Sequence, residues 1–119
     1  MNFIVSAVTD SGNTKATNQD SYSVRVFSTN VGKVVFAVIC DGMGGLSKGE
    51  VASSSLVRAF CQWSETKLPV LCEMGITDAA IRTDWTNIAV EYNRRIKIHG
   101  KKCGTSMGTT VTALLLTEQ

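Results

Sequence analysis

A run of apolar residues that stops at an acidic, glycine-rich segment limits the folds open to this chain. Residues 34–40 read VVFAVIC, and the five residues that follow read DGMGG. A continuous apolar run of this length predicts a central strand that is covered on both faces. The glycines after it are expected to break regular structure. The sequence therefore places one carboxylate, Asp41, directly after a buried strand.

Three other segments have the composition of strands. Residues 3–9 are apolar and β-branched, residues 22–27 alternate between polar and apolar side chains, and residues 109–116 are rich in threonine, valine and leucine. The segment 29–33 contains an asparagine and a glycine, which favours a hairpin between the second and third strands. Much of the sheet is therefore expected to be antiparallel.

Two sets of apolar residues recur at helical spacing between the third and fourth strands. The first set is Ala52, Leu56, Ala59, Phe60 and Trp63, and the second is Ile81, Trp85, Ile88, Tyr92 and Ile96. Thr77 is expected to cap the second helix and Gly100 to end it. The predicted order is three strands, two helices and one strand, which is an α+β arrangement, with the two tryptophans in the core.

The overall charge does not select a nucleic acid or a membrane as a partner. The chain has 119 residues and a formal net charge of +2. One local cluster is basic and consists of Arg94, Arg95, Lys97, Lys101 and Lys102 around the single histidine, His99. Such a cluster most often marks a solvated helix end, where cations complement the helix dipole. Docking of a phosphorylated or acidic partner is the alternative.

Cysteine usage and hydropathy predict a cytoplasmic protein. The four cysteines are Cys40, Cys61, Cys72 and Cys103, and none of them lies in a CxxC pair. Their spacing indicates reduced thiols rather than a zinc site or a disulfide framework. Residues 1–8 are too short for the apolar region of a signal peptide, and no run approaches the length of a membrane span.

Two acidic residues lie at junctions between strands and turns. Asp20 precedes the second predicted strand, and Asp41 follows the third. If these strands form a hairpin, the start of one lies beside the end of the other, and the two carboxylates meet at one end of the sheet. Converging carboxylates can hold a hard divalent ion such as Mg²⁺ or Mn²⁺. The neighbouring glycines would let a substrate phosphate come close.

Each of these features also has a plainer interpretation. An isolated Asp-Gly is most often a simple turn, and Asn-Gln-Asp alone indicates nothing. The sequence contains no GxxxxGK[ST], no GxGxxG and no GxSxG, so nucleotide-binding and serine-hydrolase motifs are excluded. The residues by themselves indicate an oxyanion or metal site on a mixed sheet, and they do not identify a reaction.

Three segments resemble motifs of the PPM (PP2C) family of metal-dependent serine/threonine phosphatases. Residues 10–20 read DSGNTKATNQD and resemble the first motif, D-x-G-x-x-R-x-x-N-[EQ]-D. Residues 41–53 read DGMGGLSKGEVAS and resemble the second, DGMGG-x-x-x-G-E-x-A-S, in its bacterial form. Residues 107–110 read MGTT and resemble a third. The motifs follow the family's order and span nearly the whole chain.

The resemblance implies a fold, a cofactor and a chemistry. The fold would be a sandwich of two antiparallel sheets flanked by helices, of which residues 1–119 form the N-terminal, incomplete part. The active site would hold two or more Mn²⁺ or Mg²⁺ ions, and a metal-bound water would attack the phosphorus of phosphoserine or phosphothreonine. The partners would be phosphorylated proteins, opposing a serine/threonine kinase.

The resemblance also implies roles for individual residues. Asp41 would bridge both metals, the Gly42 carbonyl would bind one of them, and Asp20 would act through metal-bound water. Gln19 stands where many members have glutamate, so it would contact water without adding charge. Lys15 stands where the family has its phosphate-binding arginine, and it offers a point charge in place of a bidentate fork.

The chain lacks the later GDSR, SDG and Asp-Asn segments of the family, which supply further metal ligands. We therefore expect the 119 residues alone to be nearly inactive, and to be dimeric or bound to a missing half. The alternatives to a phosphatase are a non-catalytic phosphatase-like module that binds a partner, and a regulatory or assembly domain whose acidic turns bind nothing.

Overall fold

The described residues form one antiparallel sheet and three helices. The computed structural model describes residues 19–30, 32–44 and 48–118. Its elements are β1 (Asp20–Thr29), β2 (Gly32–Gly44), α1 (Lys48–Thr66), α2 (Leu68–Met74), α3 (Asp78–Cys103), β3 (Met107–Thr109) and β4 (Thr112–Thr117). The predicted α+β arrangement is confirmed. The predicted strand at residues 3–9 lies outside the described residues.

Strand β2 is the centre of the sheet. It pairs with β1 on one side, and with β3 and β4 on the other, and all of these pairings are antiparallel. The predicted hairpin is confirmed, because Thr29 lies opposite Gly32 at the turn. Gly32 has a φ of 97°, a conformation that favours glycine. The hairpin fixes the register of the whole β1–β2 pair.

The prediction that regular structure breaks at residue 41 is wrong. Strand β2 continues to Gly44, and its last three residues pair with β3: Gly42 lies opposite Thr109, and Gly44 lies opposite Met107. The short strand β3 supplies a partner that the local sequence of β2 could not reveal. The predicted last strand, residues 109–116, is likewise divided into β3 and β4.

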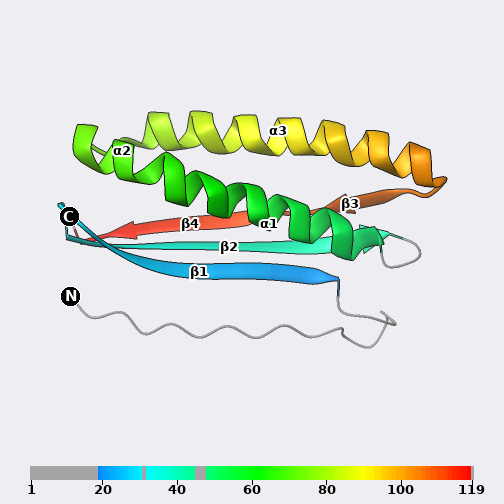
Figure 1. Cartoon of the computed structure of the whole chain (residues 1–119), viewed down its shortest axis with the longest axis horizontal. Helices are drawn as coiled ribbons and strands as arrows, with labels where there is room; N and C mark the ends of the chain where they lie inside the picture. The colour runs from blue at the N-terminus through cyan, green and yellow to red at the C-terminus, as the bar shows by residue number, and fades with distance from the viewer. Residues whose placement is uncertain (1–18, 31, 45–47, 119) are drawn as a thin grey trace.

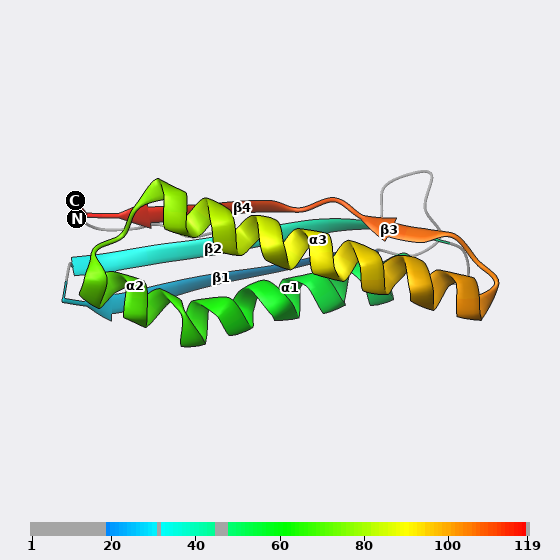
Figure 2. The ribbon, with the colours of Figure 1, turned by 90° about the horizontal axis from the view of Figure 1, so that it is seen from above.

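Both long helices cover the same face of the sheet (Figure 1). Alternate residues of β2, namely Val34, Phe36, Val38 and Cys40, are fully buried and belong to a core that includes side chains of α1 and α3. Viewed from above, α1 and α3 run side by side over the strands (Figure 2). Alternation of side chains along a strand points the intervening residues of β2 to the opposite face.

That opposite face is covered unevenly along β2: Val35 is only 6% exposed. Ile39 is 54% exposed and Met43 is 58% exposed. The prediction that β2 is covered on both faces therefore holds at Val35 and is wrong at Ile39.

An aromatic cluster joins the helices to the sheet. Phe36 of β2 lies 5.6 Å from Trp63 of α1 and 6.1 Å from Trp85 of α3, measured between ring centroids. The two tryptophan rings are 5.6 Å apart in an edge-on arrangement, which is favourable for aromatic pairs. The prediction that both tryptophans are core residues is confirmed, although Trp85 is only partly buried.

The helix boundaries differ from the prediction at one end. The Thr77 side chain accepts a hydrogen bond from the Ala80 N–H, so the predicted cap of α3 is confirmed. The predicted end at Gly100 is wrong: α3 continues to Cys103 and ends at Gly104, which has a φ of 68°. Gly100 is buried instead, and a Cβ there would lie 3.3 Å from the side chain of Met107.

The short helix α2 was not predicted. It begins with a proline in its first turn and has only seven residues, which is too few for an apolar period to show in the sequence.

Candidate active site

The two predicted acidic residues lie directly opposite each other in the sheet. Asp20 is the first residue of β1, and its register partner in β2 is Asp41. The Gly42 N–H donates to the Gln19 carbonyl at 3.2 Å, so the Gln19–Gly42 pair is hydrogen-bonded and the next pair, Asp20–Asp41, is not. Cα atoms in such a pair are about 4.5 Å apart, and their side chains are close neighbours on the same face. The predicted convergence of these carboxylates is confirmed.

The carboxylates lie on the open face of the sheet, at the end where β1 begins and β2 ends (Figure 1). Asp41 is exposed and Asp20 is partly buried. Like charges directly opposite each other destabilise a sheet, and a hard divalent cation between them would reverse that effect, because oxygen ligands suit Mg²⁺ and Mn²⁺. This donor set fits such an ion.

The main chain of Asp41 is held from the other side by the segment that joins β3 to β4. The Asp41 carbonyl accepts a hydrogen bond from the Thr110 N–H at 2.9 Å. The Asp41 N–H donates to the Thr110 side-chain oxygen at 3.3 Å. These bonds fix the backbone at Asp41.

A second set of contacts ties the start of β1 to the start of α1. The Gln19 side-chain amide donates to the Gly44 carbonyl at 3.2 Å. The Gln19 carbonyl also accepts a hydrogen bond from the fully buried Ser53 hydroxyl at 2.6 Å. Ser53 in turn lies 3.0 Å from the hydroxyl of Ser21. Gln19 is thus held in place through both its main chain and its side chain.

The glycines of the second motif allow these elements to approach closely. Gly42 and Gly49 are both buried. A Cβ on Gly49 would overlap the side-chain oxygen of Gln19 and would lie 2.6 Å from the Met43 nitrogen. A Cβ on Gly42 would overlap the carbonyl of Gly49. Only residues without a side chain fit where β2 meets α1.

The sequence interpretation missed the structural roles of Ser53, Gly49 and Thr110. All three belong to the segments that carried the family resemblance, DGMGG-x-x-x-G-E-x-A-S and MGTT. The signal was therefore present, but only three-dimensional contacts between separate segments show what these residues do.

Few further ligands can be added to the acidic pair from the described residues. Lys15 lies outside the described residues. Within the described ranges, no group of three or more histidine, cysteine, aspartate or glutamate side chains could hold a metal. Cys40 adjoins Asp41, but burial raises the pKa of its thiol to about 11. A neutral thiol is a poor metal ligand, so Cys40 does not extend the acidic pair.

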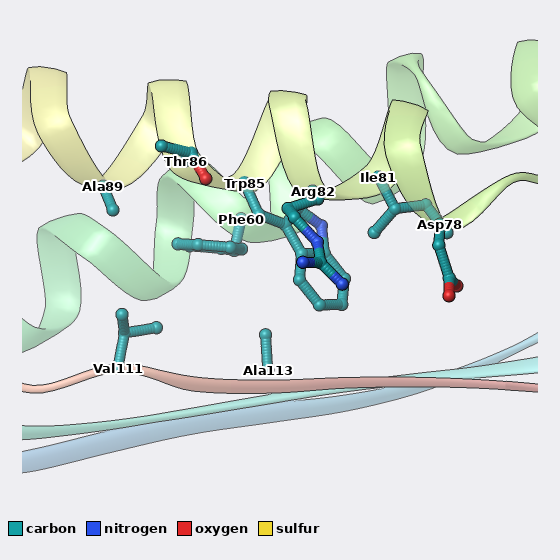
Figure 3. Close-up of a pocket in the computed structure, with 9 residues that line it drawn as sticks. All are labelled: Phe60, Asp78, Ile81, Arg82, Trp85, Thr86, Ala89, Val111 and Ala113. Atoms are coloured by element: carbon teal, nitrogen blue, oxygen red, sulfur yellow. The ribbon is translucent and has the colours of Figure 1, made fainter.

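A separate groove lies between α3 and β4 and has a volume of about 410 Å³. Figure 3 shows Trp85 of α3 reaching toward Ala113 of β4, with Phe60 and Val111 beside it. The indole N–H of Trp85 is buried and has no hydrogen-bond partner among the described residues. Apolar and aromatic side chains dominate the floor of the groove, so it offers no second site for phosphate chemistry.

None of the described helices is long and apolar enough to cross a membrane.

No protein-family model and no curated protein matches the chain. Two solved structures do match it. A serine/threonine phosphatase from S. agalactiae is 28% identical, with a TM-score of 0.63, over 92% of this chain and 42% of that one.

The second match is a bacterial serine phosphatase that carries a point mutation. It is 24% identical, with a TM-score of 0.61, over 94% of this chain and 48% of that one. The chain thus spans less than half the length of either structure. The predicted resemblance is confirmed: this chain has the fold of part of a bacterial serine/threonine phosphatase domain of the PPM (PP2C) type.

Proposed function

We propose that this chain contributes one half of the metal site of a protein serine/threonine phosphatase, which hydrolyses phosphoserine and phosphothreonine. The observation that carries the proposal is the register of the sheet, which sets Asp20 directly opposite Asp41. The likeness to a serine/threonine phosphatase over 92% of the chain supports the reaction class.

Asp20, Asp41 and the Gly42 carbonyl would hold Mn²⁺ or Mg²⁺. When bound, such an ion lowers the pKa of water and neutralises charge on phosphoryl oxygens. The chain itself supplies the orientation. Thr110 fixes the backbone of Asp41, and Ser53 fixes Gln19, the residue before Asp20. Lys15 would bind the substrate phosphate as a point charge.

A second candidate function is a phosphatase-like module that binds a partner without catalysis. The described residues offer two neighbouring carboxylates but no larger cluster of ligands, and two carboxylates alone cannot fill the coordination shells of two ions. This small number of ligands favours the binding module only if no other part of the protein adds further carboxylates to the site.

One activity assay separates the two candidates. The protein to be assayed is the longest natural polypeptide that contains these 119 residues. Its turnover of para-nitrophenyl phosphate and of a phosphothreonine peptide is measured with Mn²⁺, with Mg²⁺ and with excess chelator. We expect turnover only with metal, and we expect Asp41→Asn to remove nearly all of it, because a charged ligand is lost with almost no change in volume.

The role of Lys15 is tested in the same assay. Lys15→Ala should mainly raise KM, whereas Lys15→Arg should keep or improve activity. Full turnover in chelator would exclude the metal mechanism, and absence of turnover under every condition would favour the binding module.

A further inference from the structure

Met43 is a large apolar side chain that remains exposed beside the proposed metal site. Asp41 and Met43 are exposed along β2, whereas Gly42 between them is buried. Because side chains alternate along a strand, Met43 projects from the same open face as Asp41. The proposed metal chemistry gives Met43 no role, because a thioether is a weak ligand for hard divalent ions. Its 58% exposure next to the acidic pair therefore needs another explanation.

The neighbour of Met43 in β3 is a glycine, which leaves the open face bare at that position. Gly108 is the register partner of Met43, and such partners point to the same face of a sheet. A Cβ on Gly108 would meet no described atom within 4 Å. Gly108 is not among the described glycines with a positive φ, so its backbone does not require glycine. A glycine inside a strand often marks a place where another backbone or a ligand comes close.

Met43 lies one side-chain period away from the acidic pair. Two residues of β2 separate Asp41 from Met43, which corresponds to about 6.7 Å along the strand. An extended peptide has the same period, because side chains two residues apart point to one side and lie about 7 Å apart. A peptide that runs parallel to β2, with its phosphorylated side chain at the acidic pair, would therefore place the side chain two residues away beside Met43.

In the other direction along β2 the open face is occupied by large apolar side chains. Tyr22 and Ile39 are register partners, and they are 42% and 54% exposed. They belong to an apolar patch of the kind that another layer of protein covers. Met43, by contrast, is one residue from the end of β2, at the rim of the sheet (Figure 1). A substrate chain that follows β2 from the acidic pair is therefore expected to leave toward Met43.

The chemistry of Met43 and Gly108 limits what such a chain can present to them. Neither side chain carries a charge or a hydrogen-bond donor, so the pair offers nothing to a charged residue. The unbranched side chain of methionine adapts to apolar partners of different shapes. Gly108 lets such a partner lie close to the backbone of β3.

We propose that Met43 and Gly108 bind an apolar side chain of the phosphoprotein substrate, located two residues from its phosphorylated serine or threonine. This inference rests on the proposed phosphatase function, and it gives Met43 a role in substrate specificity rather than in the chemical step. An apolar contact away from the reacting atoms is the same in the ground state and in the transition state. It should therefore lower KM and leave kcat nearly unchanged.

Peptide substrates test the spacing. The longest natural polypeptide that contains these 119 residues is assayed with Mn²⁺ on phosphothreonine peptides. In one pair of peptides, leucine or serine occupies both positions two residues from the phosphothreonine, and in a second pair it occupies both adjacent positions. We expect leucine to lower KM about fivefold in the first pair, through partial burial against Met43, and by less than about twofold in the second.

Two variants connect this preference to Met43 and Gly108. Met43→Ser should reduce the ratio of KM between the serine and leucine peptides of the first pair from about five to about one, because the apolar contact is lost. Gly108→Val should raise KM for the leucine peptide about tenfold, because a side chain then fills the open position. Valine suits a strand and its Cβ meets no described atom within 4 Å, so we expect an unchanged circular dichroism spectrum.

The matched control is Met74→Ser. Met74 is the last residue of α2 and is 80% exposed, and α2 lies at the opposite end of the molecule from the acidic pair (Figure 1). We expect this variant to keep the fivefold preference.

Three results would overturn the inference while leaving the phosphatase proposal intact. These are equal KM values for the leucine and serine peptides of the first pair, a preference that persists in Met43→Ser, and a stronger preference at the adjacent positions. Absence of turnover with every peptide would instead show that the phosphatase proposal has failed, and the substrate role of Met43 would fail with it.

Discussion

Ser53 shows how a single hydroxyl can position the acidic pair without touching it. Its side chain is fully buried, donates to the Gln19 carbonyl at 2.6 Å and lies 3.0 Å from the Ser21 hydroxyl. Gln19 and Ser21 flank Asp20 on both sides. A buried hydroxyl of this kind holds the first residues of β1 in the register that sets Asp20 opposite Asp41.

Ser53→Ala should therefore lower the free energy of unfolding by about 1–2 kcal/mol, because a buried hydrogen bond is lost and the Ser21 hydroxyl loses a partner. Ser55→Ala is the control, since among the described residues the Ser55 hydroxyl bonds only to the Val51 carbonyl of its own helix. That variant should change stability by less than about 0.5 kcal/mol. Urea denaturation measures both. Similar losses for the two variants would show that Ser53 has no special role.

At the scale of elements, the contact between β2 and α1 depends on the glycines of the second motif. Gly49→Ala should destabilise the fold by about 2 kcal/mol or more, because the added methyl group would collide with Gln19 and with the β2 backbone. Gly108→Ala is the matched control in β3, where a Cβ would meet nothing within 4 Å. Thermal unfolding of both variants checks this. A stable Gly49→Ala protein would mean that α1 can move away from β2 at little cost.

The elements also show which parts of the fold local sequence can predict. The hairpin, the two long helices and the Thr77 cap follow from periodicity and turn chemistry, which act between near neighbours. The extension of β2 through Gly44 depends on β3, which lies more than sixty residues away. The extension of α3 past Gly100 depends on packing against Met107. Partners distant in sequence override local preferences in both cases.

The same reasoning applies to the site. The meeting of Asp20 and Asp41 could be predicted, because a hairpin brings the start of one strand beside the end of the other. The contributions of Ser53 and Thr110 could not, because they depend on which helix and which loop lie against the ends of the strands.

At the scale of the whole molecule, one face of the sheet is apolar and exposed. Its large side chains are Tyr22, Val26, Ile39, Leu114 and Leu116, which are between 42% and 54% exposed. Their register partners place them together on the side away from the helices. Apolar patches of this kind mark surfaces that another layer covers, as the sandwich implied by the family resemblance requires.

We therefore expect the 119-residue chain to self-associate through this face, or to bind the remainder of a phosphatase domain there. Ile39→Lys/Leu114→Lys should shift the chain toward monomer in analytical ultracentrifugation at micromolar concentration. Val90→Lys, on the outer side of α3 and 65% exposed, should leave the association unchanged. A wild-type chain that is monomeric, with unfolding independent of concentration, would contradict the expected assembly.

The proposal that Asp20 and Asp41 hold a metal ion is tested most directly by titrating the 119-residue chain with Mn²⁺. Binding is monitored by calorimetry and by the electron paramagnetic resonance signal of the free ion. Two carboxylates and one carbonyl should give a single weak site. Asp41→Asn should abolish binding and Asp20→Asn should weaken it, whereas Glu73→Gln, at an exposed position of α2, should have no effect. Unchanged binding in Asp41→Asn, or two tight sites in the wild-type chain, would contradict the account.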